Sequence, residues 1–355
     1  MPDFLWSAEE SPRRRLALAP LALLEWPYRL GAWIHRRLYT TGLRSRVRLD
    51  PGVVSVGNLC VGGSGKTPLV GWLASELRAR GHRVAILSRG VGGRRERETN
   101  VVSDGERVLL GAADVGDEPV LLAGRARGVP VFAGRNRVAL GLRASALFGA
   151  ELLILDDGFQ HHRLARDLDL VCVDASEGLG NGHVLPRGPL REPAGALRYA
   201  DAIVWTRVPR TGAALPTLPE SAAGVRRFSV EVALRGLRRI GERALEPPES
   251  LSGRKVGLLA AIARPDRVRA TLRDLGAEVA LERTFADHYR YRRADVASLD
   301  PGVLWLTTEK DAVKIPASWA RNTELCVLEE EVRPENGPAL IDFVLQRVQK
   351  GGGAR

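Results

Sequence analysis

The chain has 355 residues, of which 45% are hydrophobic and 27% charged, and this composition is typical of a globular protein with room for about two domains. Lys and Arg exceed Asp and Glu by 53 to 42, and the net charge of +11 favours partners that carry phosphate or other anionic groups. The sequence has none of the common nucleic-acid-binding motifs and its three cysteines lie far apart, so we expect no nucleic-acid partner, no disulfide framework and a reducing cytosol.

An apolar and basic segment over residues 12–46 is the first predicted element. Charges at Glu25 and Arg29 interrupt it well short of the roughly 20 apolar residues that span a membrane. No cleavable signal is expected, because acidic residues precede the apolar stretch and arginines follow it. The mixture of aromatic residues, leucines and arginines fits a helix in the membrane interface, but it fits an ordinary amphipathic helix packed on the domain equally well. We expect Pro20 and Pro27 to bend or divide this helix.

A strand, a glycine-rich turn and a helix follow in the stretch VVSVGNLCVGGSGKTPLV, residues 53–70. This is the order of a phosphate-binding P-loop, in which backbone N–H groups surround phosphate oxygens and the helix dipole adds positive potential. Lys66 is expected to reach the β- and γ-phosphates, and the Thr67 hydroxyl to hold Mg²⁺. Cys60 replaces the first glycine of the usual pattern, so a plain glycine-rich turn is the alternative. The candidate nucleotide-binding residues are Gly62, Gly63, Ser64, Gly65, Lys66 and Thr67.

Further short apolar runs predict a parallel sheet after the P-loop. Residues 94–107 are charged and are expected to be exposed. Asp117 stands where a helix over Val120–Arg127 begins, and on sequence physics alone capping is the favoured role for an acid at that place. A second helix is predicted over Asn136–Phe148. The other strands predicted in this half of the chain are His82–Leu87, Val129–Ala133, Asp169–Asp174 and Asp201–Thr206.

A buried strand over Leu152–Leu155 ends in two adjacent acids, Asp156 and Asp157, with Gln160 and His161 close behind. P-loop enzymes use an acid at this place to bind Mg²⁺, directly or through water, and an ordinary polar turn is the alternative. A long loop rich in glycine and proline, residues 180–193, then places polar residues at the ligand-facing edge of the sheet. Its arginines at positions 187 and 191 suit phosphate binding, although a rigid surface excursion gives the same pattern.

The C-terminal part of the sequence predicts a second, smaller α/β unit. Residues 208–222 resemble an exposed connection, and Val225–Ile240 alternates as expected for a pair of linking strands. His288 lies in a polar stretch, where a lone histidine more often serves packing or the surface than chemistry. Two of the five lysines, at positions 310 and 314, follow a predicted strand. The remaining predicted elements are strands Lys255–Ala261, Val303–Leu306 and Leu325–Leu328, a helix that opens at Arg264–Asp266, a closing helix Pro338–Val348 and a disordered glycine-rich tail.

In this order the motifs resemble the lipid A 4′-kinase (tetraacyldisaccharide 4′-kinase, LpxK) family over roughly residues 15–345. The resemblance rests on GNLCVGGSGKTP, SRGVGG, GDEP, DDGFQHHRL, LPRGPLREP, FADHYRY and TTEKDAVK. Among these, DDGFQH after its strand is far more specific than the P-loop alone. Two positions depart from the family pattern: Cys60 stands where threonine is expected and Val91 where tyrosine is expected, and neither departure removes a catalytic group.

The resemblance implies ATP-dependent phosphorylation of the 4′-hydroxyl of an acylated disaccharide 1-phosphate lipid, with Mg²⁺ as cofactor. It also implies a peripheral (monotopic) enzyme on the anionic cytoplasmic face of a Gram-negative inner membrane, and the sequence indicates no oligomeric state. The implied fold is a P-loop NTPase-type α/β domain with a parallel sheet, joined by a β-strand linker to a second, smaller α/β domain. The expected boundaries are a membrane-associating segment at 1–46, the P-loop domain at 47–222, the linker at 223–250, the smaller domain at 251–336, and a helix and tail at 337–355.

The resemblance also assigns roles to single residues. Asp117 matches the general base and His288 the histidine that pairs with it, while Lys66 and Asp157 match catalytic positions and Asp156 a Mg²⁺ position. A sugar hydroxyl is a poor nucleophile, so a carboxylate within hydrogen-bond reach is needed to accept its proton. The two members of the pair come from different domains, so domain closure would assemble the site. The polar positions matched to substrate binding are Gln160, His161, Arg191 and Glu192.

Two other functions remain as alternatives at this stage. One is a different P-loop NTPase, such as a nucleotide switch or a nucleic-acid-linked ATPase, that uses the basic surface. It leaves the N-terminal segment unexplained. The other is a membrane-binding scaffold with a decayed nucleotide site, which the intact Lys66, Thr67, Asp156 and Asp157 disfavour.

Overall fold

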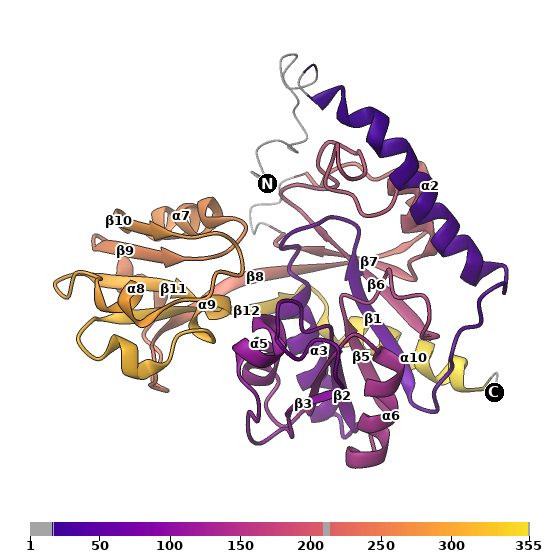
Figure 1. Cartoon of the computed structure of the whole chain (residues 1–355), viewed down its shortest axis with the longest axis horizontal. Helices are drawn as coiled ribbons and strands as arrows, with labels where there is room; N and C mark the ends of the chain where they lie inside the picture. The colour runs from indigo at the N-terminus through magenta and orange to yellow at the C-terminus, as the bar shows by residue number, and fades with distance from the viewer. Residues whose placement is uncertain (1–15, 17, 209–213, 354–355) are drawn as a thin grey trace.

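The computed structural model describes residues 16, 18–208 and 214–353 (Figure 1). Within these residues, twelve strands form one sheet in the order β10-β9-β11-β12-β8-β7-β6-β1-β5-β2-β4-β3. The sheet passes through two regions that lie side by side in Figure 1. We call them the P-loop region (β1–β7 with α3–α6) and the C-terminal region (β9–β11 with α7–α9). The chain is therefore an α/β protein, as the sequence predicts.

The P-loop region contains a mostly parallel sheet with helices on its faces. Every residue of the central strand β1 is buried, as expected for a strand that helices cover on both sides. Its parallel strands are β1 (Gly52–Asn58), β2 (Val84–Ser88), β4 (Val131–Ala133), β5 (Leu152–Asp156), β6 (Leu168–Asp174) and β7 (Ala202–Thr206). Its helices are α3 (Lys66–Ala79), α4 (Ala112–Val115), α5 (Asp117–Arg125) and α6 (Arg137–Phe148).

The edge of this sheet differs from the prediction. Residues 94–107 are not exposed throughout, because β3 (Asn100–Ser103) pairs antiparallel with β4. Val102 is fully buried and joins the main core, and the Asn100 side chain donates a hydrogen bond to the backbone oxygen of Ala133. The strand was missed because only two consecutive valines interrupt a charged stretch. Packing against α5 supplies the burial that the local pattern does not show.

One long strand, β8 (Arg226–Arg239), joins the two regions (Figure 1). The expectation of two strands within 225–240 is wrong. The partner of β8 is β12 (Leu325–Pro334), which pairs with it antiparallel and is longer than predicted. Because β8 also pairs with β7 and β12 with β11, the sheet continues without a break from one region to the other. Residues 209–213 of the expected connection lie outside the described residues.

The C-terminal region is a small parallel sheet with its own core. Its strands are β9 (Lys255–Ala260), β10 (Glu278–Thr284) and β11 (Leu304–Thr308), and its helices are α7 (Pro265–Asp274), α8 (Arg293–Ala297) and α9 (Glu309–Ala312). Short 3-10 turns complete the chain at η2 (Ala194–Tyr199), η3 (Glu220–Ala222), η4 (Pro248–Leu251) and η5 (Ala317–Ala320). The last helix, α10 (Gly337–Gly353), returns to the P-loop region and packs on β1. It extends past its expected end at Val348, and residues 354–355 of the expected tail lie outside the described residues.

Most of the described N-terminal segment forms one helix, α2 (Leu21–Thr40), along one side of the P-loop region (Figure 1). Leu16 and Leu18 are helical, a turn follows at Ala19 and Pro20, and α2 begins at Leu21, so the expected division occurs at Pro20. Helix α2 continues through Pro27, which lies inside it. No residue of α2 is buried, and its outer face exposes large apolar side chains. Among the described residues, no helix combines the length and apolar character needed to cross a bilayer. Residues 1–15 and 17 of the predicted segment lie outside the described residues.

Candidate active site

The glycine-rich loop between β1 and α3 has a fixed base and an open tip. Gly65 adopts a positive φ of 72°, and a Cβ there would come within 3.0 Å of the Thr206 side chain, so the position requires glycine. The Asn58 amide holds the loop by donating to Cys60 O (2.6 Å) and to Ser64 Oγ (2.8 Å). Gly62 and Gly63 are exposed at the tip, where their backbone is accessible to a ligand. The local geometry is that of a phosphate-binding loop.

The loop that precedes η2 is joined to the P-loop through the backbone. Val61 N donates to Pro189 O (2.8 Å) and Arg191 N donates to Leu59 O (2.7 Å). These two bonds place the Arg191 side chain next to the end of β5, where its guanidinium donates to Asp157 Oδ2 (2.7 Å). The long glycine- and proline-rich loop therefore contributes an arginine to the candidate site.

Asp157 lies between two cations. Lys66 Nζ is 3.4 Å from its Oδ1, and Arg191 contacts the other oxygen. Burial raises the pKa of Asp157, but the charges and hydrogen bonds of Lys66 and Arg191 outweigh burial and hold that pKa well below its usual range. Asp157 is thus an ionised acid at neutral pH, and it links the P-loop lysine to the 180–193 loop.

Asp156 has the opposite electrostatic environment. It is fully buried at the end of β5, and burial, with the charges of Glu118 and Asp157, raises its pKa to about 7. Ser88 donates a hydrogen bond to Oδ2 (3.1 Å), while Oδ1 is buried without a hydrogen-bond partner among the described residues. A buried acceptor oxygen in a negative environment favours a bound cation. The two adjacent acids therefore differ: Asp157 forms ion pairs with Lys66 and Arg191, whereas Asp156 forms none within the described part of the chain.

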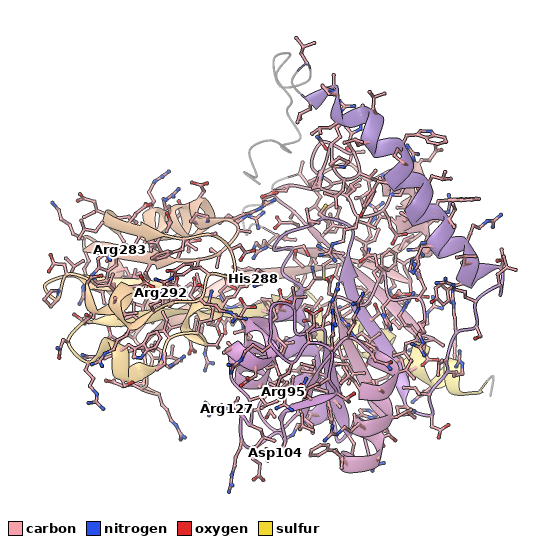
Figure 2. The ribbon with its side chains drawn as sticks, in the orientation of Figure 1. Arg95, Asp104, Arg127, Arg283, His288 and Arg292 are labelled. Carbon is pink, nitrogen blue, oxygen red and sulfur yellow. The ribbon has the colours of Figure 1, made fainter. Side chains whose placement is uncertain are left out.

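Asp117 and His288 meet across the two regions, although 171 positions separate them in the sequence. His288 Nδ1 is 2.9 Å from Asp117 Oδ2 and 3.1 Å from Oδ1. Asp117 is buried at the first position of α5, whereas His288 is part-exposed where the two regions meet (Figure 2). Burial raises the pKa of Asp117, but the hydrogen bond from His288 and the charge of Lys310 lower it below its usual value. Asp117 also accepts the N–H of Glu118 (2.9 Å), so it combines a helix-start contact with the histidine pair.

The segment that carries His288 is held by aromatic packing and one backbone contact. Phe285 and Tyr289 stack with ring centroids 4.3 Å apart, and Tyr291 packs edge-on against both rings. The Arg290 side chain reaches the P-loop region and donates to Gly92 O (2.6 Å). Between these supports, His288 adopts a positive φ of 62°, which is uncommon for a residue with a side chain. Such a conformation is typical of a residue that its surroundings force into position.

Three of the expected substrate-binding residues, Gln160, His161 and Glu192, differ in their contacts and in their charge. The Gln160 amide donates to Asn58 O (3.0 Å). His161 is half-buried, and burial together with Arg137 lowers its pKa to about 4, so the ring is neutral. Glu192 is buried in a two-contact ion pair with Arg36 of α2 (2.7 and 2.9 Å). The neighbouring His162 packs against the rings of His35 and Tyr39 on α2.

Two residues near the site were not predicted as site residues. Arg137 is buried at the start of α6, and burial lowers its pKa to about 10 despite the opposing charge of Asp156. Nothing in the local sequence distinguishes this arginine from the many others. Lys310 lies 3.3 Å from His288 Nε2 and 3.1 Å from Asp287 Oδ1. Lysine is scarce in this chain, and that scarcity could have marked Lys310 as a candidate. The sequence alone does not show that Lys310 contacts His288.

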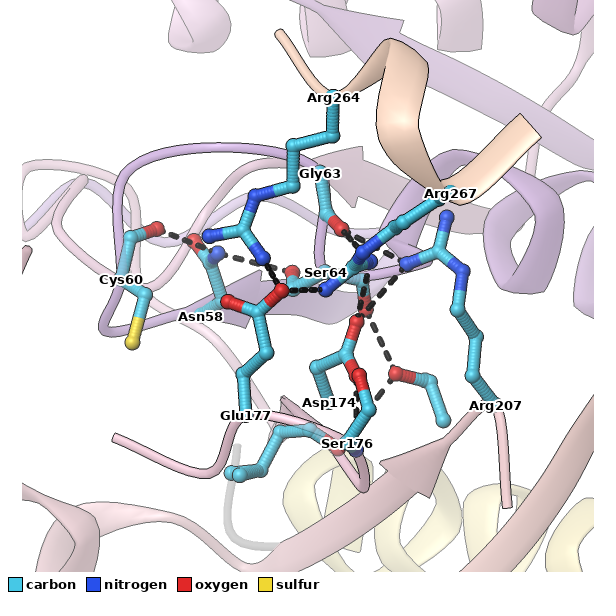
Figure 3. Close-up of polar contacts among 12 residues, drawn as sticks. Asn58, Cys60, Gly63, Ser64, Asp174, Ser176, Glu177, Arg207, Arg264 and Arg267 are labelled. Carbon is cyan, nitrogen blue, oxygen red and sulfur yellow. Dashed lines mark hydrogen bonds and ion pairs between the residues drawn. The ribbon is translucent and has the colours of Figure 1, made fainter. Parts of the chain in front are cut away.

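A cluster of arginines and acids joins α7 of the C-terminal region to the P-loop (Figure 3). Arg267 donates to Asp174 Oδ2 (2.7 Å) and to Gly63 O (3.3 Å), and it also pairs with Glu177. Arg207 contacts the same two oxygens at 3.0 and 2.7 Å. Arg264 forms an ion pair with Glu177. The two regions are therefore in contact on the P-loop side as well as at Asp117 and His288.

Comparison with known proteins shows that the chain is similar to tetraacyldisaccharide 4′-kinases. A model of the tetraacyldisaccharide-1-P 4′-kinase family matches residues 15–349. The chain is 44% identical to a tetraacyldisaccharide 4′-kinase of Anaeromyxobacter sp., over 91% of this chain and 89% of that protein. It is 46% identical to one of Geobacter metallireducens, over 85% and 89% respectively. LpxK from Aquifex aeolicus, solved in complex with ATP, matches with a TM-score of 0.77 and 31% identity, over 94% of this chain and 99% of that chain.

Proposed function

The chain belongs to the tetraacyldisaccharide 4′-kinase family, and from that premise we propose which of its residues carry out each part of the reaction. The protein is a phosphotransferase that moves the γ-phosphate of ATP to the 4′-hydroxyl of a tetraacyldisaccharide 1-phosphate in lipid A biosynthesis. The family, the fold class and the enzyme class expected from the sequence motifs are confirmed. The observation that carries the residue assignment is the contact between Asp117 and His288.

Residues of the P-loop and the β5 end bind the phosphate chain of ATP. The backbone of Gly62–Gly65 supplies N–H groups, and Lys66 supplies a positive charge at the first position of α3. Asp157 holds Lys66 and Arg191 on its two sides, so two cations are fixed close together at the end of the P-loop. In a loose phosphoryl-transfer transition state, charge spreads over the phosphoryl oxygens, and pre-positioned cations stabilise that charge without reorganisation.

Asp117 is the general base for the 4′-hydroxyl, and His288 is its hydrogen-bond partner. The lowered pKa of Asp117 keeps its carboxylate ionised at neutral pH, which is the form that accepts a proton. The adjacent Glu118 influences the pKa of Asp156, so the start of α5 faces the acid pair. The proposed base and the proposed phosphate-binding residues therefore belong to one continuous site. Gln160, His161 and Glu192 complete the substrate side, with Glu192 held in place by Arg36.

The residues present also fit a Mg²⁺ ion. Among the described residues, no group of three or more His, Cys, Asp or Glu side chains could hold a metal by itself. Kinase Mg²⁺ sites need fewer protein ligands, because phosphate oxygens and water complete the shell. Thr67 and Asp156 would hold the ion, and the unpartnered Oδ1 of Asp156 is the observation that supports this assignment. When bound, Mg²⁺ neutralises phosphate charge.

Helix α2 is the proposed contact with the anionic cytoplasmic face of the inner membrane, which makes the enzyme peripheral. Its inner face is tied to the 180–193 loop by Glu25 with His183 (3.0 Å) and by Arg36 with Glu192. Trp26 and Trp33 are 70% and 55% exposed, and they border a groove between α2 and the segment at 192–199. The two alternatives left by the sequence are thus compatible, because one helix packs on the protein while presenting aromatic residues that suit a membrane interface.

The test of the function uses pure protein, Mg-ATP and tetraacyldisaccharide 1-phosphate in detergent. Mass spectrometry is expected to show one added phosphate on the lipid. An unchanged lipid under conditions where the protein binds ATP would count heavily against the assignment.

The membrane contact has its own test. Trp26→Ala with Trp33→Ala is expected to weaken sedimentation with anionic vesicles by about 5–10-fold, because the helix loses two exposed aromatic side chains that would enter the membrane interface. The matched control is Leu142→Ala with Leu147→Ala, which removes exposed apolar side chains from α6 instead (57% and 56% exposed). Equal sedimentation of both double variants and wild type would contradict the role of α2.

A further inference from the structure

Lys310 contacts the outer nitrogen of the histidine that pairs with Asp117. Its Nζ is 3.3 Å from His288 Nε2 and 3.1 Å from Asp287 Oδ1, and its side chain is 22% exposed. An ammonium group has three donors and no acceptor, so a hydrogen bond between Lys310 and His288 requires the ring nitrogen to accept. With Nε2 accepting, the ring proton of a neutral His288 must lie on Nδ1, which faces Asp117 at 2.9 Å. One tautomer therefore satisfies both contacts.

The helix that carries Lys310 is braced on both sides. Asp311, fully buried, accepts the backbone N–H of Ala261 (3.0 Å), which fixes α9 to the C-terminal region. Glu309 forms an ion pair with Arg125 and accepts the N–H of Glu330 (3.1 Å). Helix α9 is thus held to the C-terminal region by one residue and to the P-loop region by another, with Lys310 between them.

The same short helix contacts both ends of α5. Asp117 is the first residue of α5 and Arg125 is the last. Lys310 reaches the Asp117 end through His288, and Glu309 reaches the Arg125 end directly. Glu309 therefore fixes the start of α9 next to α5, and contacts with Asp287 and His288 hold the Lys310 ammonium. This arrangement is expected of a group that orients its neighbour.

The charged groups around His288 act in opposite directions. Asp117 on α5 and Asp287 on its own segment favour the imidazolium, whereas Lys310 on α9 disfavours it. The hydrogen bond from Asp117 is the largest influence, and the pKa of His288 is raised overall. The charge of Glu118 acts on Lys310 together with Asp117 and Asp287, and these acids keep the ammonium charged although burial opposes them. Among the charged groups that act on His288 in the described part of the chain, Lys310 is therefore the cation that opposes its protonation.

We propose that Lys310 is a positioning residue that fixes the neutral Nδ1–H tautomer of His288, so that the ring donates to Asp117 and the Asp117 carboxylate stays available to the substrate hydroxyl. The proposal rests on Asp117 as the base. An imidazolium at this place would bind Asp117 more strongly and weaken it as a base, while the Nε2–H tautomer would leave Asp117 facing a ring lone pair. Lys310 disfavours both of these forms.

Nitrogen NMR of protein labelled with ¹⁵N-histidine tests the tautomer without a kinetic assay. The His288 signals are assigned by their loss in His288→Gln. In the wild type at pH 8.5, Nδ1 is expected to have the shift of a protonated ring nitrogen and Nε2 that of an unprotonated one. In Lys310→Met, the apparent pKa of His288 is expected to rise by about one unit, because the opposing charge is gone. A wild-type Nε2–H tautomer, or an unchanged titration in Lys310→Met, would overturn the proposal.

Enzyme kinetics then separate positioning from a purely structural role. Lys310→Met is expected to lower kcat about 10-fold, to leave the KM for ATP unchanged, and to move the acid limb of the kcat–pH profile toward higher pH. Lys310→Arg keeps the positive charge, so the acid limb of its kcat–pH profile is expected to stay at the wild-type pH. Lys255→Met, an exposed lysine-to-methionine change in the same region, is the control and should match the wild type. A loss in Lys310→Met that is uniform across pH would contradict the proposal.

Failure of the base assignment gives a different result. If Asp117→Asn kept wild-type turnover, Asp117 would not be the base, yet the NMR titration would still report whether Lys310 fixes the tautomer. If Asp117→Asn abolished turnover while the titration of Lys310→Met matched the wild type, the base would stand and the role of Lys310 would fall.

Discussion

The P-loop and the Asp117–His288 pair, the two parts of the proposed site, are built in different ways. The P-loop is a continuous stretch between β1 and α3. Asn58 holds its base, and more distant residues, such as Arg207 and Arg267, contact its tip at Gly63. The pair joins residues 171 positions apart, from two regions that a shared sheet and a few polar contacts hold together. The proposed nucleotide-binding residues thus come from one short stretch, whereas the proposed activation of the acceptor hydroxyl depends on how the two regions are joined.

The sharpest test of this comparison sets Lys66→Ala against Asp117→Ala. Lys66→Ala is expected to lose both ATP affinity and turnover, because the P-loop charge acts on the nucleotide itself. Asp117→Ala is expected to lower kcat by about 10²–10⁴-fold and to leave ATP affinity unchanged. Steady-state kinetics and equilibrium ATP binding give the two quantities.

The control for this pair is Asp104→Ala, an acid on the outer surface of the P-loop region (Figure 2). It should match the wild type in both measurements. Loss of ATP affinity in Asp117→Ala would indicate that Asp117 supports the P-loop instead of acting on the hydroxyl, and the separation between the two parts of the site would be lost.

A second test weakens the junction between the two regions, meaning the contact between Arg125 of α5 and Glu309 of α9, without changing Asp117 or His288. Arg125→Ala removes the cation from Glu309, and the two side chains are only 12% and 15% exposed. An uncompensated part-buried acid is costly, so we expect the free energy of unfolding to fall by about 2–3 kcal/mol and kcat to fall with an unchanged KM for ATP. Denaturant unfolding and kinetics measure these effects.

The matched control is Arg83→Ala, which removes an arginine from an exposed ion pair with Glu151 (66% and 41% exposed). Exposed pairs contribute little, so a change within about 0.5 kcal/mol is expected. Arg125→Lys keeps a cation near Glu309 and should restore most of the activity. If Arg125→Ala lost ATP affinity as well as kcat, the junction and the P-loop would not be independent.

The difference in construction explains what the sequence could predict. The P-loop, the acid pair after Leu152–Leu155 and most central strands follow from short contiguous patterns, and all are in the structure where expected. The prediction of two strands within residues 225–240 was wrong, because the antiparallel partner of β8 lies about a hundred residues later, in β12. Pairing over that distance leaves no local signal.

The same reasoning applies to the site. For Asp117, sequence physics favoured helix capping, and the structure shows a helix-start contact together with the contact to His288. Only the family motifs suggested the second contact, since no local pattern connects GDEP with FADHYRY. Arg137 and Lys310 were missed as site residues for the same reason: burial and neighbouring charge give them their roles, and both are properties of the folded chain.

The smallest expected effect concerns the pH dependence of stability at the pair. The pKa of His288 is raised in the folded protein, so the stability it contributes is fully present below the pKa of the unfolded chain and is lost as pH rises through the folded value. The pKa of Asp117 is lowered, so its contribution is lost only in strong acid. The charged pair is therefore complete near pH 5–6. His288→Gln should destabilise the protein more at pH 5.5 than at pH 9.

The expected difference between the two pH values is about 0.5 kcal/mol, because His288 is 38% exposed and solvent screens the pair. Urea unfolding of wild type and His288→Gln at both pH values measures it, and His82→Gln, whose ring faces Glu151 on the outer surface, is the control (3.3 Å). Only the neutral hydrogen bond from Nδ1 to Asp117 remains at pH 9. If His288→Gln lowered the free energy of unfolding by the same amount at both pH values, His288 would not change its charge in this range. The contact between the two regions would then be held by the neutral ring throughout, and the junction would be as insensitive to pH as the P-loop.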